Sequence, residues 1–417
     1  MLDSSRSDLE RHGVVPRRSD SLASDLLLPD ETLEVRREVR AFADSVLRPI
    51  ARELNCEPER RDGFRHDVFD RMASAGLFAI PFPEDVGGRA LRYPTLATLS
   101  VLEELAYYAP GIASSMYDAQ AILVGNTLNQ APPALRGEFL PRLVRGEFVA
   151  SFATSEPGAS TDLSVRSVQT VAHRHDEGWL VTGRKRWITN AVAARYVILL
   201  CRTGDALSLL FADMHAPGVS VSDPDMKMGN HAQLTADIEF KNVLVPHHHV
   251  LGEIGAGLRS ALGSLVLGRM GIGAVGVGMA QRAFDISSHY ISHRSVFERP
   301  IAAFQHWQFR FAEHAMQIDS ARSAYQRAAL LTDRGENAEV LAAMAKVMGS
   351  SAAVEMSRDA IQCCGGYGFV RTLGASGEDW PLESIYRDAK IGEIYEGANE
   401  VQKWIIARKI FGRAITG

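Results

Sequence analysis

The spacing of apolar residues divides the chain into three zones. In residues 30–149 apolar side chains such as Val39 and Phe42 recur every three or four positions, which is typical of amphipathic helices. In residues 150–254 the period falls to two, in short runs bounded by Gly, Pro and Asp. Helical periodicity returns in residues 255–417. The pattern predicts an α+β multidomain fold: an N-terminal helical domain, a small middle β-barrel or sandwich domain, and a C-terminal antiparallel four-helix bundle.

Individual elements can be predicted within these zones. Helices are expected at 95–108, 258–294, 304–334, 338–363 and 399–411. Strands are expected at 167–173, 179–183, 196–201, 208–211, 219–221 and 238–245. The first two strands are separated by Asp176-Glu177-Gly178, which predicts a hairpin.

Residues 1–29 are polar and lack the apolar core of a signal peptide, so we expect a mobile leader there. No apolar run reaches the length that a membrane span requires, and none is predicted. The net charge is -5, which gives no electrostatic reason to expect nucleic acid as a partner. The four cysteines show no metal-ligand or disulfide spacing, so we predict no metal site and a cytoplasmic protein.

The stretch 271–276 matches the pattern GxGxxG of dinucleotide-binding turns. That motif needs a strand before it and a helix after it, whereas here it lies inside a predicted helix. Its glycines are therefore expected to permit close helix packing, and we do not read them as a nucleotide site.

Three other segments carry candidate chemistry. The residues 152–162 are rich in Ser, Thr and Gly, and could hold a flavin or a phosphate or form a polar surface loop. The segment 186–190 places Trp187 beside hydroxyl and amide side chains, or else ends a strand with a buried Trp. Glu396 follows an apolar pair and precedes a glycine, and could be a general base or an exposed residue at a helix boundary.

Together these motifs, in this order on an α-β-α pattern, resemble the acyl-CoA dehydrogenase family of flavoproteins over residues 30–415. The resemblance implies FAD as cofactor and Glu396 as the base that removes the α-proton of an acyl thioester. A branch of the family carries its base at the position of Gly268, which cannot serve. The residues that the resemblance assigns to FAD are Phe152, Thr154, Ser155, Ser160, Thr161, Trp187, Ile188, Thr189, Arg294, Phe297, Phe304, Gln305, Gln362, Gly365, Gly366, Ala398 and Glu400.

The resemblance also assigns substrate contacts to Thr161, Arg269, Tyr395 and Asp118. Asp118 matches a position near the far end of the acyl pocket, where it would disfavour a long alkyl chain; otherwise it faces solvent or caps a helix. Val266 stands where many members carry an Asp that helps bind CoA. A carrier-protein thioester therefore remains an alternative to an acyl-CoA.

Further partners also follow from the resemblance. These are an electron-transfer flavoprotein as acceptor, and a homodimer or homotetramer because cofactor contacts come from two subunits. An oxygen-using relative of oxidase type and a non-catalytic subunit are the competing hypotheses.

Overall fold

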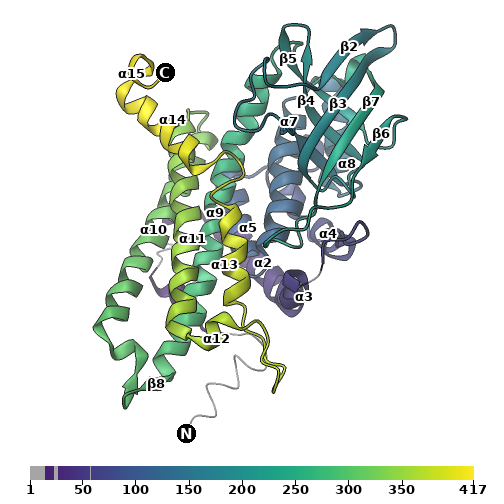
Figure 1. Ribbon diagram of the computed structural model, residues 1–417. Helices are drawn as coiled ribbons and strands as arrows, with labels where there is room; N and C mark the ends of the chain where they lie inside the picture. The colour runs from purple at the N-terminus through teal and green to yellow at the C-terminus, as the bar shows by residue number, and fades with distance from the viewer. Residues whose placement is uncertain (1–14, 23–26, 57) are drawn as a thin grey trace.

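The computed structural model describes residues 15–22, 27–56 and 58–417, and has helical, β and helical parts in that order (Figure 1). The N-terminal helices are α2 (Asp30–Phe42), α3 (Ala51–Cys56), α4 (His66–Ser74), α5 (Pro94–Ala106), α6 (Pro110–Ile112), α7 (Asn126–Asn129) and α8 (Pro133–Val144). Two segments are wound as π-helix, η3 (Ala43–Leu47) and η7 (Ala113–Gly125). Short 3-10 turns are η1 (Arg18–Ser21), η4 (Arg48–Ile50), η5 (Leu77–Ala79), η6 (Glu84–Val86), η8 (His247–His249) and η9 (Ile301–Ala303).

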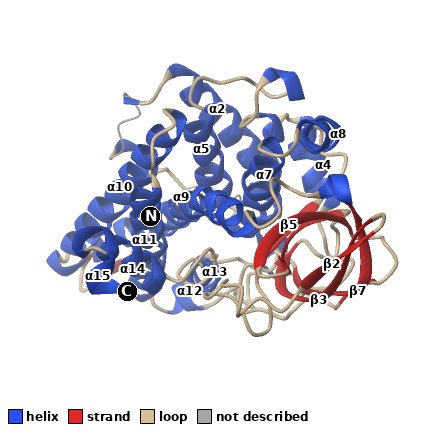
Figure 2. Cartoon of the chain, turned by 90° about the horizontal axis from the view of Figure 1, so that it is seen from above, coloured by secondary structure: helices blue, strands red, loops and turns tan. Residues whose placement is uncertain are grey.

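The middle part is one curled seven-stranded sheet, which Figure 2 shows nearly end-on as a ring beside the helices. Its strands are β1 (Ala150–Ala153), β2 (Val171–His175), β3 (Gly178–Thr189), β4 (Tyr196–Thr203), β5 (Ala206–Asp213), β6 (Val219–Val221) and β7 (Thr235–Pro246). The order is β1-β4-β2-β3-β7-β6, with β5 paired to β4. The predicted hairpin is confirmed, since β2 and β3 pair antiparallel from His175 opposite Gly178. β1 was not predicted as a strand.

The C-terminal part is a bundle of long helices. They are α9 (Gly257–His293), α10 (Gln305–Asp333), α11 (Glu339–Cys364) and α13 (Leu382–Ile391), followed by α14 (Asn399–Phe411) and α15 (Arg413–Thr416). The hairpin β8 (Ser295–Val296) and β9 (Arg299–Pro300) joins α9 to α10, and α12 (Gly366–Phe369) follows α11. The predicted long helices are confirmed to within a residue or two, but α13 was not predicted.

The glycines of the GxGxxG stretch serve helix packing, as predicted. A Cβ on Gly276 of α9 would lie 2.4 Å from the backbone carbonyl carbon of Gly349 of α11. A Cβ on Gly273 would lie 2.8 Å from the backbone oxygen of Ala345. The two helices therefore approach at backbone distance, and no strand precedes the motif.

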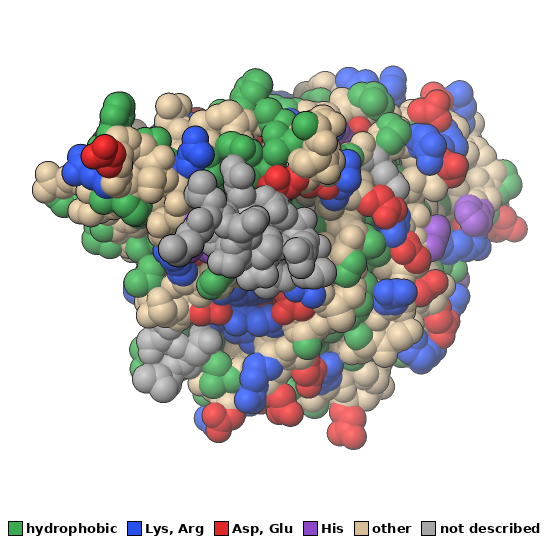
Figure 3. Space-filling model, turned by 90° about the horizontal axis from the view of Figure 1, so that it is seen from below, with side chains coloured by type: hydrophobic (Ala, Val, Ile, Leu, Met, Phe, Trp, Pro, Cys, Tyr) green, Lys and Arg blue, Asp and Glu red, His purple; other side chains and the backbone are tan. Residues whose placement is uncertain are grey.

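Of the described part of the chain, α9 alone is long and apolar enough by composition to cross a membrane, and 72% of its most apolar stretch is buried inside the fold. Figure 3 shows acidic and basic side chains interspersed over the lower face of the molecule.

Residues 1–14 and 23–26 of the expected leader lie outside the described residues. The described residues 15–22 pack on the bundle, since Ser19 donates from its N–H and its hydroxyl to the carboxylate of Asp285 at 2.9 and 3.0 Å. Arg17 forms an ion pair with Glu104 at 2.7 Å. This piece of the leader is therefore held against α9 and α5 by polar contacts.

Candidate active site

Glu396 lies in the turn that joins α13 to α14. The N–H of Asn399 donates to the carbonyl of Glu393 at 3.0 Å, and the amide of Gln402 donates to the carbonyl of Gly397 at 3.0 Å. Glu396 itself has a φ of 55°, and Gly397 has a φ of 87°. A left-handed backbone at a residue other than glycine is strained and tends to occur at functional sites. The turn therefore fixes the direction of the Glu396 side chain.

That side chain points at α9, where Gly268 makes room for it. A Cβ on Gly268 would lie 2.8 Å from Oε2 of Glu396. Oε2 is buried and accepts no hydrogen bond from any described residue. The alternative of an exposed glutamate at a helix boundary is thus not what the structure shows. Gly268 has no side chain that could act as a base. The carboxyl of Glu396 occupies the space that such a side chain would fill.

Burial raises the pKa of Glu396 to about 7, against the opposing effect of two cations. Those cations are Arg269, on α9 next to Gly268, and Lys346, on α11. Lys346 is buried and donates to the amide oxygen of Asn399 at 2.8 Å. Burial lowers the pKa of Lys346 to about 8, while the Glu396 carboxylate favours its charged form. A carboxyl that titrates near neutral pH, with cations nearby, suits a general base.

Asp118 lies in the middle of the π-helix η7 and is only 3% exposed. It therefore neither faces solvent nor caps a helix, and its place near the far end of an acyl pocket stays a prediction. A Cβ on Gly271 would lie 2.5 Å from Oδ1 of Asp118, and no described residue donates a hydrogen bond to that atom. Burial raises the pKa of Asp118 well above its ordinary value, and the carboxylate of Glu396 raises it further.

The two predicted segments of the middle part meet where β1 and β3 end. The N–H of Arg186 donates to the carbonyl of Ser155 at 2.9 Å, and the hydroxyl of Ser151 donates to the carbonyl of Thr189 at 2.8 Å. Thr154 and Ser155 are half-buried, whereas Ser160 and Thr161 are exposed. Phe152 is half-buried on β1, and Ile188 is buried in the sheet core, so the side chain of Ile188 is not available to a ligand.

A polar network ties this strand end to the helical parts. The amide of Gln233 donates to the hydroxyl of Thr189 at 3.0 Å, and the amide of Asn230 donates to Gln233 at 2.6 Å. The hydroxyl of Ser114 on η7 reaches the same oxygen of Gln233 at 3.2 Å. The N–H of Asn230 donates to Asp388 of α13 at 2.5 Å. The network therefore joins the end of β3 to η7, which carries Asp118, and to α13, which precedes the Glu396 turn.

Gln233, Asn230, Ser114 and Lys346 belong to this site but were not predicted from the sequence. Gln233 and Asn230 occupy an irregular loop with no periodicity, and Ser114 is one of an unbroken run of buried residues. Lys346 sits in an apolar stretch of α11, and a lysine interrupting such a stretch is the one signal that could have pointed to it.

The remaining predicted residues lie far from Glu396 in the same chain. Arg294, Phe297, Phe304 and Gln305 surround the β8–β9 hairpin, which Figure 1 shows at the lower end of the bundle near α12. Gln362 lies in the last turn of α11, Gly365 and Gly366 lie at the start of α12, and all three are exposed. Arg294 follows Arg269 by 25 positions, almost all of them on one continuous helix, which is about 37 Å. One chain therefore does not bring its two sets of predicted cofactor residues together.

Phe297 at the tip of this hairpin is 88% exposed, and both Phe297 and Glu298 have positive φ values, of 51° and 66°. Two successive left-handed residues make the tight turn that matches the twist of a two-residue hairpin. The guanidinium of Arg299 lies 3.9 Å from the ring centre of Phe304, which braces the base of the hairpin.

Three further predicted residues lie next to Glu396 in the chain. Tyr395 is half-buried, and Glu400 is exposed on the first turn of α14. Ala398 offers no hydroxyl where the family often has Thr. Val266 packs against the main apolar core. Position 266, one helical turn before Arg269, therefore carries no carboxylate.

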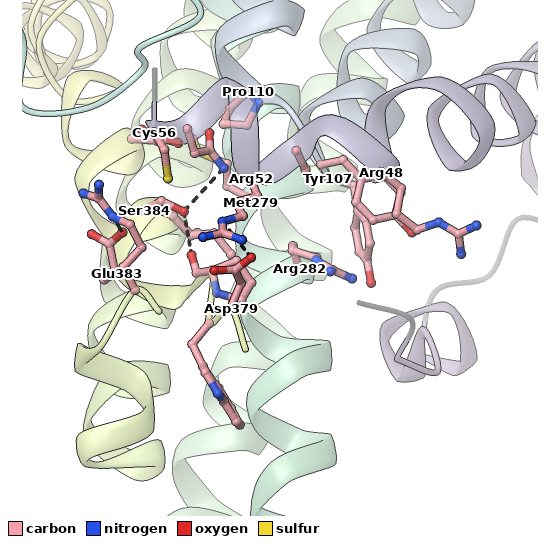
Figure 4. Close-up of a pocket in the computed structure, with 18 of the residues that line it drawn as sticks. Arg48, Arg52, Cys56, Tyr107, Pro110, Met279, Arg282, Asp379, Glu383 and Ser384 are labelled. Atoms are coloured by element: carbon pink, nitrogen blue, oxygen red, sulfur yellow. Dashed lines mark hydrogen bonds and ion pairs between the residues drawn. The ribbon is translucent and has the colours of Figure 1, made fainter. Parts of the chain in front are cut away.

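A separate pocket of about 450 Å³ is lined by residues of α3, the end of α5, α9 and α13 (Figure 4). None of the predicted site residues lines it. Its charged side chains largely satisfy one another, as in the ion pairs of Arg52 with Asp379 and of Arg371 with Glu383, both at 2.8 Å. The pocket therefore differs from the Glu396 site, where the carboxyl groups of Glu396 and Asp118 each have a buried oxygen without a partner among the described residues.

Comparison with known proteins agrees with this geometry. Profiles described as acyl-CoA dehydrogenase N-terminal, middle and C-terminal domains match residues 29–147, 151–243 and 255–411. The mouse mitochondrial short-chain specific acyl-CoA dehydrogenase is 32% identical over 94% of this chain and 92% of its own. The solved butyryl-CoA dehydrogenase of Megasphaera elsdenii is 31% identical, with a TM-score of 0.85 over 93% of this chain and all of its own.

Three domains, in order and nearly end to end, therefore place the chain in the acyl-CoA dehydrogenase family. The family consists of oxidoreductases that use FAD. A third relative, PigA, was solved with FAD and proline and is 25% identical, with a TM-score of 0.85 over 94% of this chain and all of its own.

The residues at the end of β3 fit such a cofactor. Trp187 is 58% exposed, with a left-handed φ of 57°, so that a large aromatic face is left open. The hydroxyl of Thr189 accepts a hydrogen bond from Gln233, which leaves its own proton free to donate to the rim of a flavin ring.

Gly365, after the end of α11, has a φ of 60° and a ψ of -133°, a conformation that only glycine adopts readily. A Cβ there would meet no atom within 4 Å.

Proposed function

We propose that the protein dehydrogenates a short acyl thioester between its α and β carbons, with Glu396 as the base. The observation that carries this proposal is the half-buried Glu396, whose Oε2 is buried against Gly268 and whose pKa is raised to about 7. When bound, FAD supplies an acceptor for the β-hydrogen, which leaves as a hydride.

The protein's own part of the reaction is to acidify and remove the α-proton. The backbone N–H of Glu396 makes no hydrogen bond to a described residue, so it is open to the thioester carbonyl. Such a donor stabilises the negative charge that develops on the carbonyl oxygen. The carboxylate of Glu396 takes the proton, and the positive charges of Arg269 and Lys346 keep that carboxylate ionised before it reacts.

The cofactor site is proposed to be shared between two subunits. Trp187 and Thr189 would hold the flavin ring of one subunit, while Arg294, Phe297 and Gln362 of a second copy would hold its phosphates and adenine. The separation of about 37 Å between Arg269 and Arg294 supports this division. Arginine is well suited to phosphate because its guanidinium is a permanent, forked donor. The assembly would be a homodimer or homotetramer, with an electron-transfer flavoprotein as the acceptor.

A carrier-protein thioester is the second candidate substrate. It is favoured by Val266, which offers no carboxylate to the CoA end of a substrate. Comparing a CoA ester with the same acyl group on a phosphopantetheinyl carrier distinguishes the two, because only the thioester that the protein recognises should show saturation at low concentration.

Product analysis tests the proposed reaction. Incubation with butyryl-CoA and an artificial electron acceptor should give a 2-enoyl thioester that has lost two hydrogens. Glu396→Gln should lower the rate by about 10²- to 10⁴-fold, because the general base is lost. Glu393→Gln is the matched control, since Glu393 lies in the same turn and pairs with Lys390. Equal rates in the two variants would contradict the assignment of the base.

A further inference from the structure

Two carboxyl groups face the same side of α9, one helical turn apart. Glu396 lies against Gly268 and Asp118 lies against Gly271, at 2.8 and 2.5 Å from the positions that a Cβ would occupy. Residues three apart on a helix lie on one face and are displaced by about 5 Å along its axis. The two glycines thus create space on α9 for both carboxyl groups in one buried site.

The surroundings of the two carboxyl groups differ. The ionised form of Glu396 is favoured by Arg269 and Lys346. Among the described residues, no cation favours the ionised form of Asp118, which is more deeply buried and feels the charge of Glu396. Two neighbouring buried carboxyl groups do not both ionise at neutral pH. When Glu396 is ionised and able to act as a base, Asp118 therefore keeps its proton.

A protonated Asp118 is a hydrogen-bond donor with no acceptor. Its Oδ1 is buried and has no hydrogen-bond partner in the described part of the chain. A buried polar group without a partner costs several kcal/mol unless a ligand supplies one. An alkyl chain would leave this cost in place, whereas an oxygen atom in the substrate would remove it.

We propose that Asp118 is a specificity-determining residue, and that the preferred acyl group carries a hydrogen-bond-accepting oxygen beyond its β carbon. The oxygen, of an ether, hydroxyl or carbonyl group, accepts a hydrogen bond from the neutral carboxyl of Asp118. The preference rests on the proposed dehydrogenation, because it requires the acyl chain to lie beside Glu396. It identifies the substrate class more narrowly than chain length does.

Matched thioesters test this preference. 4-Methoxybutanoyl-CoA and hexanoyl-CoA have the same chain length and differ by one oxygen in place of a methylene group. The ratio of their kcat/KM values in the wild type should favour the methoxy ester by roughly ten-fold or more. Asp118→Leu should reverse the preference, because it replaces the donor with an apolar group. Asp118→Asn should keep it, because the amide still donates.

A second variant distinguishes the loss of the hydrogen bond from Asp118 from a loss of activity through misfolding. Gly271→Ala leaves Asp118 in the chain but puts a methyl group into the space that its carboxyl occupies, and should also weaken the preference. An Asp118→Leu protein that oxidises both esters with the wild-type ratio would overturn the proposal, as would a wild type that favours hexanoyl-CoA. If the wild type oxidises neither ester nor any other acyl thioester, the proposed function fails and this inference fails with it.

Discussion

The ionisation of Glu396 depends on a balance between its burial and the charges of Arg269 and Lys346. Only the ionised carboxylate can take a proton. Because the pKa is raised to about 7, activity should fall as the pH is lowered through 7 and level off above it. The pH dependence of kcat/KM measures this titration directly.

Arg269→Met should move the acidic limb of that pH profile to higher pH by about one unit, because it removes a charge that favours the carboxylate. Arg259→Met is the control, since Arg259 lies on the exposed side of the same helix. Identical profiles for the Arg269→Met variant and the wild type would show that Arg269 does not act on Glu396.

The residue scale also shows how much of the site the sequence could predict. Glu396 was predicted from its local motif and from the family resemblance, and the structure places its carboxyl in a buried position. The burial of Asp118 was not decided by the sequence, because it depends on Gly271, which lies 153 positions away. Lys346 and Gln233 were missed for the same reason, since their neighbours are distant in the chain.

At the scale of elements, the close approach of α9 and α11 depends on glycine. Gly276→Ala should destabilise the fold by about 1–3 kcal/mol, because its methyl group would collide with the backbone of Gly349. Gly263→Ala on the same helix meets no atom within 4 Å and should stabilise the fold slightly, by up to about 1 kcal/mol.

Urea unfolding midpoints of the two variants measure this difference. The midpoint of Gly276→Ala should lie below that of the wild type, and the midpoint of Gly263→Ala should lie at or above it. Two equal midpoints would mean that α9 and α11 can move apart without lowering the stability of the fold.

The long helix α10 was predicted well because exposed residues recur along it over many turns. The helical period fails where an element is buried on all sides, and every residue of η7 is buried. β1 was hidden because its four residues precede a polar loop, and α13 because it is short and follows an irregular segment. Elements that are defined mainly by their neighbours are thus the ones that sequence periodicity does not reveal.

At the scale of the whole molecule, the division of the predicted cofactor residues between two distant places supports the proposed assembly. Arg294→Ala should reduce the FAD content of the purified protein while leaving its fold intact, because Arg294 is exposed and lies after the end of α9. Arg334→Ala, an exposed arginine at the other end of α10, should retain FAD. The ratio of flavin to protein absorbance measures the effect, and equal ratios would contradict a shared site.

The most direct test of the account is an anaerobic titration with short acyl thioesters, followed by flavin absorbance near about 450 nm. The wild type should be bleached by at least one thioester. Glu396→Gln should bind flavin equally well but stay oxidised on the same timescale, because the α-proton remains on the substrate. Bleaching of Glu396→Gln at the wild-type rate would contradict the central claim that Glu396 is the base.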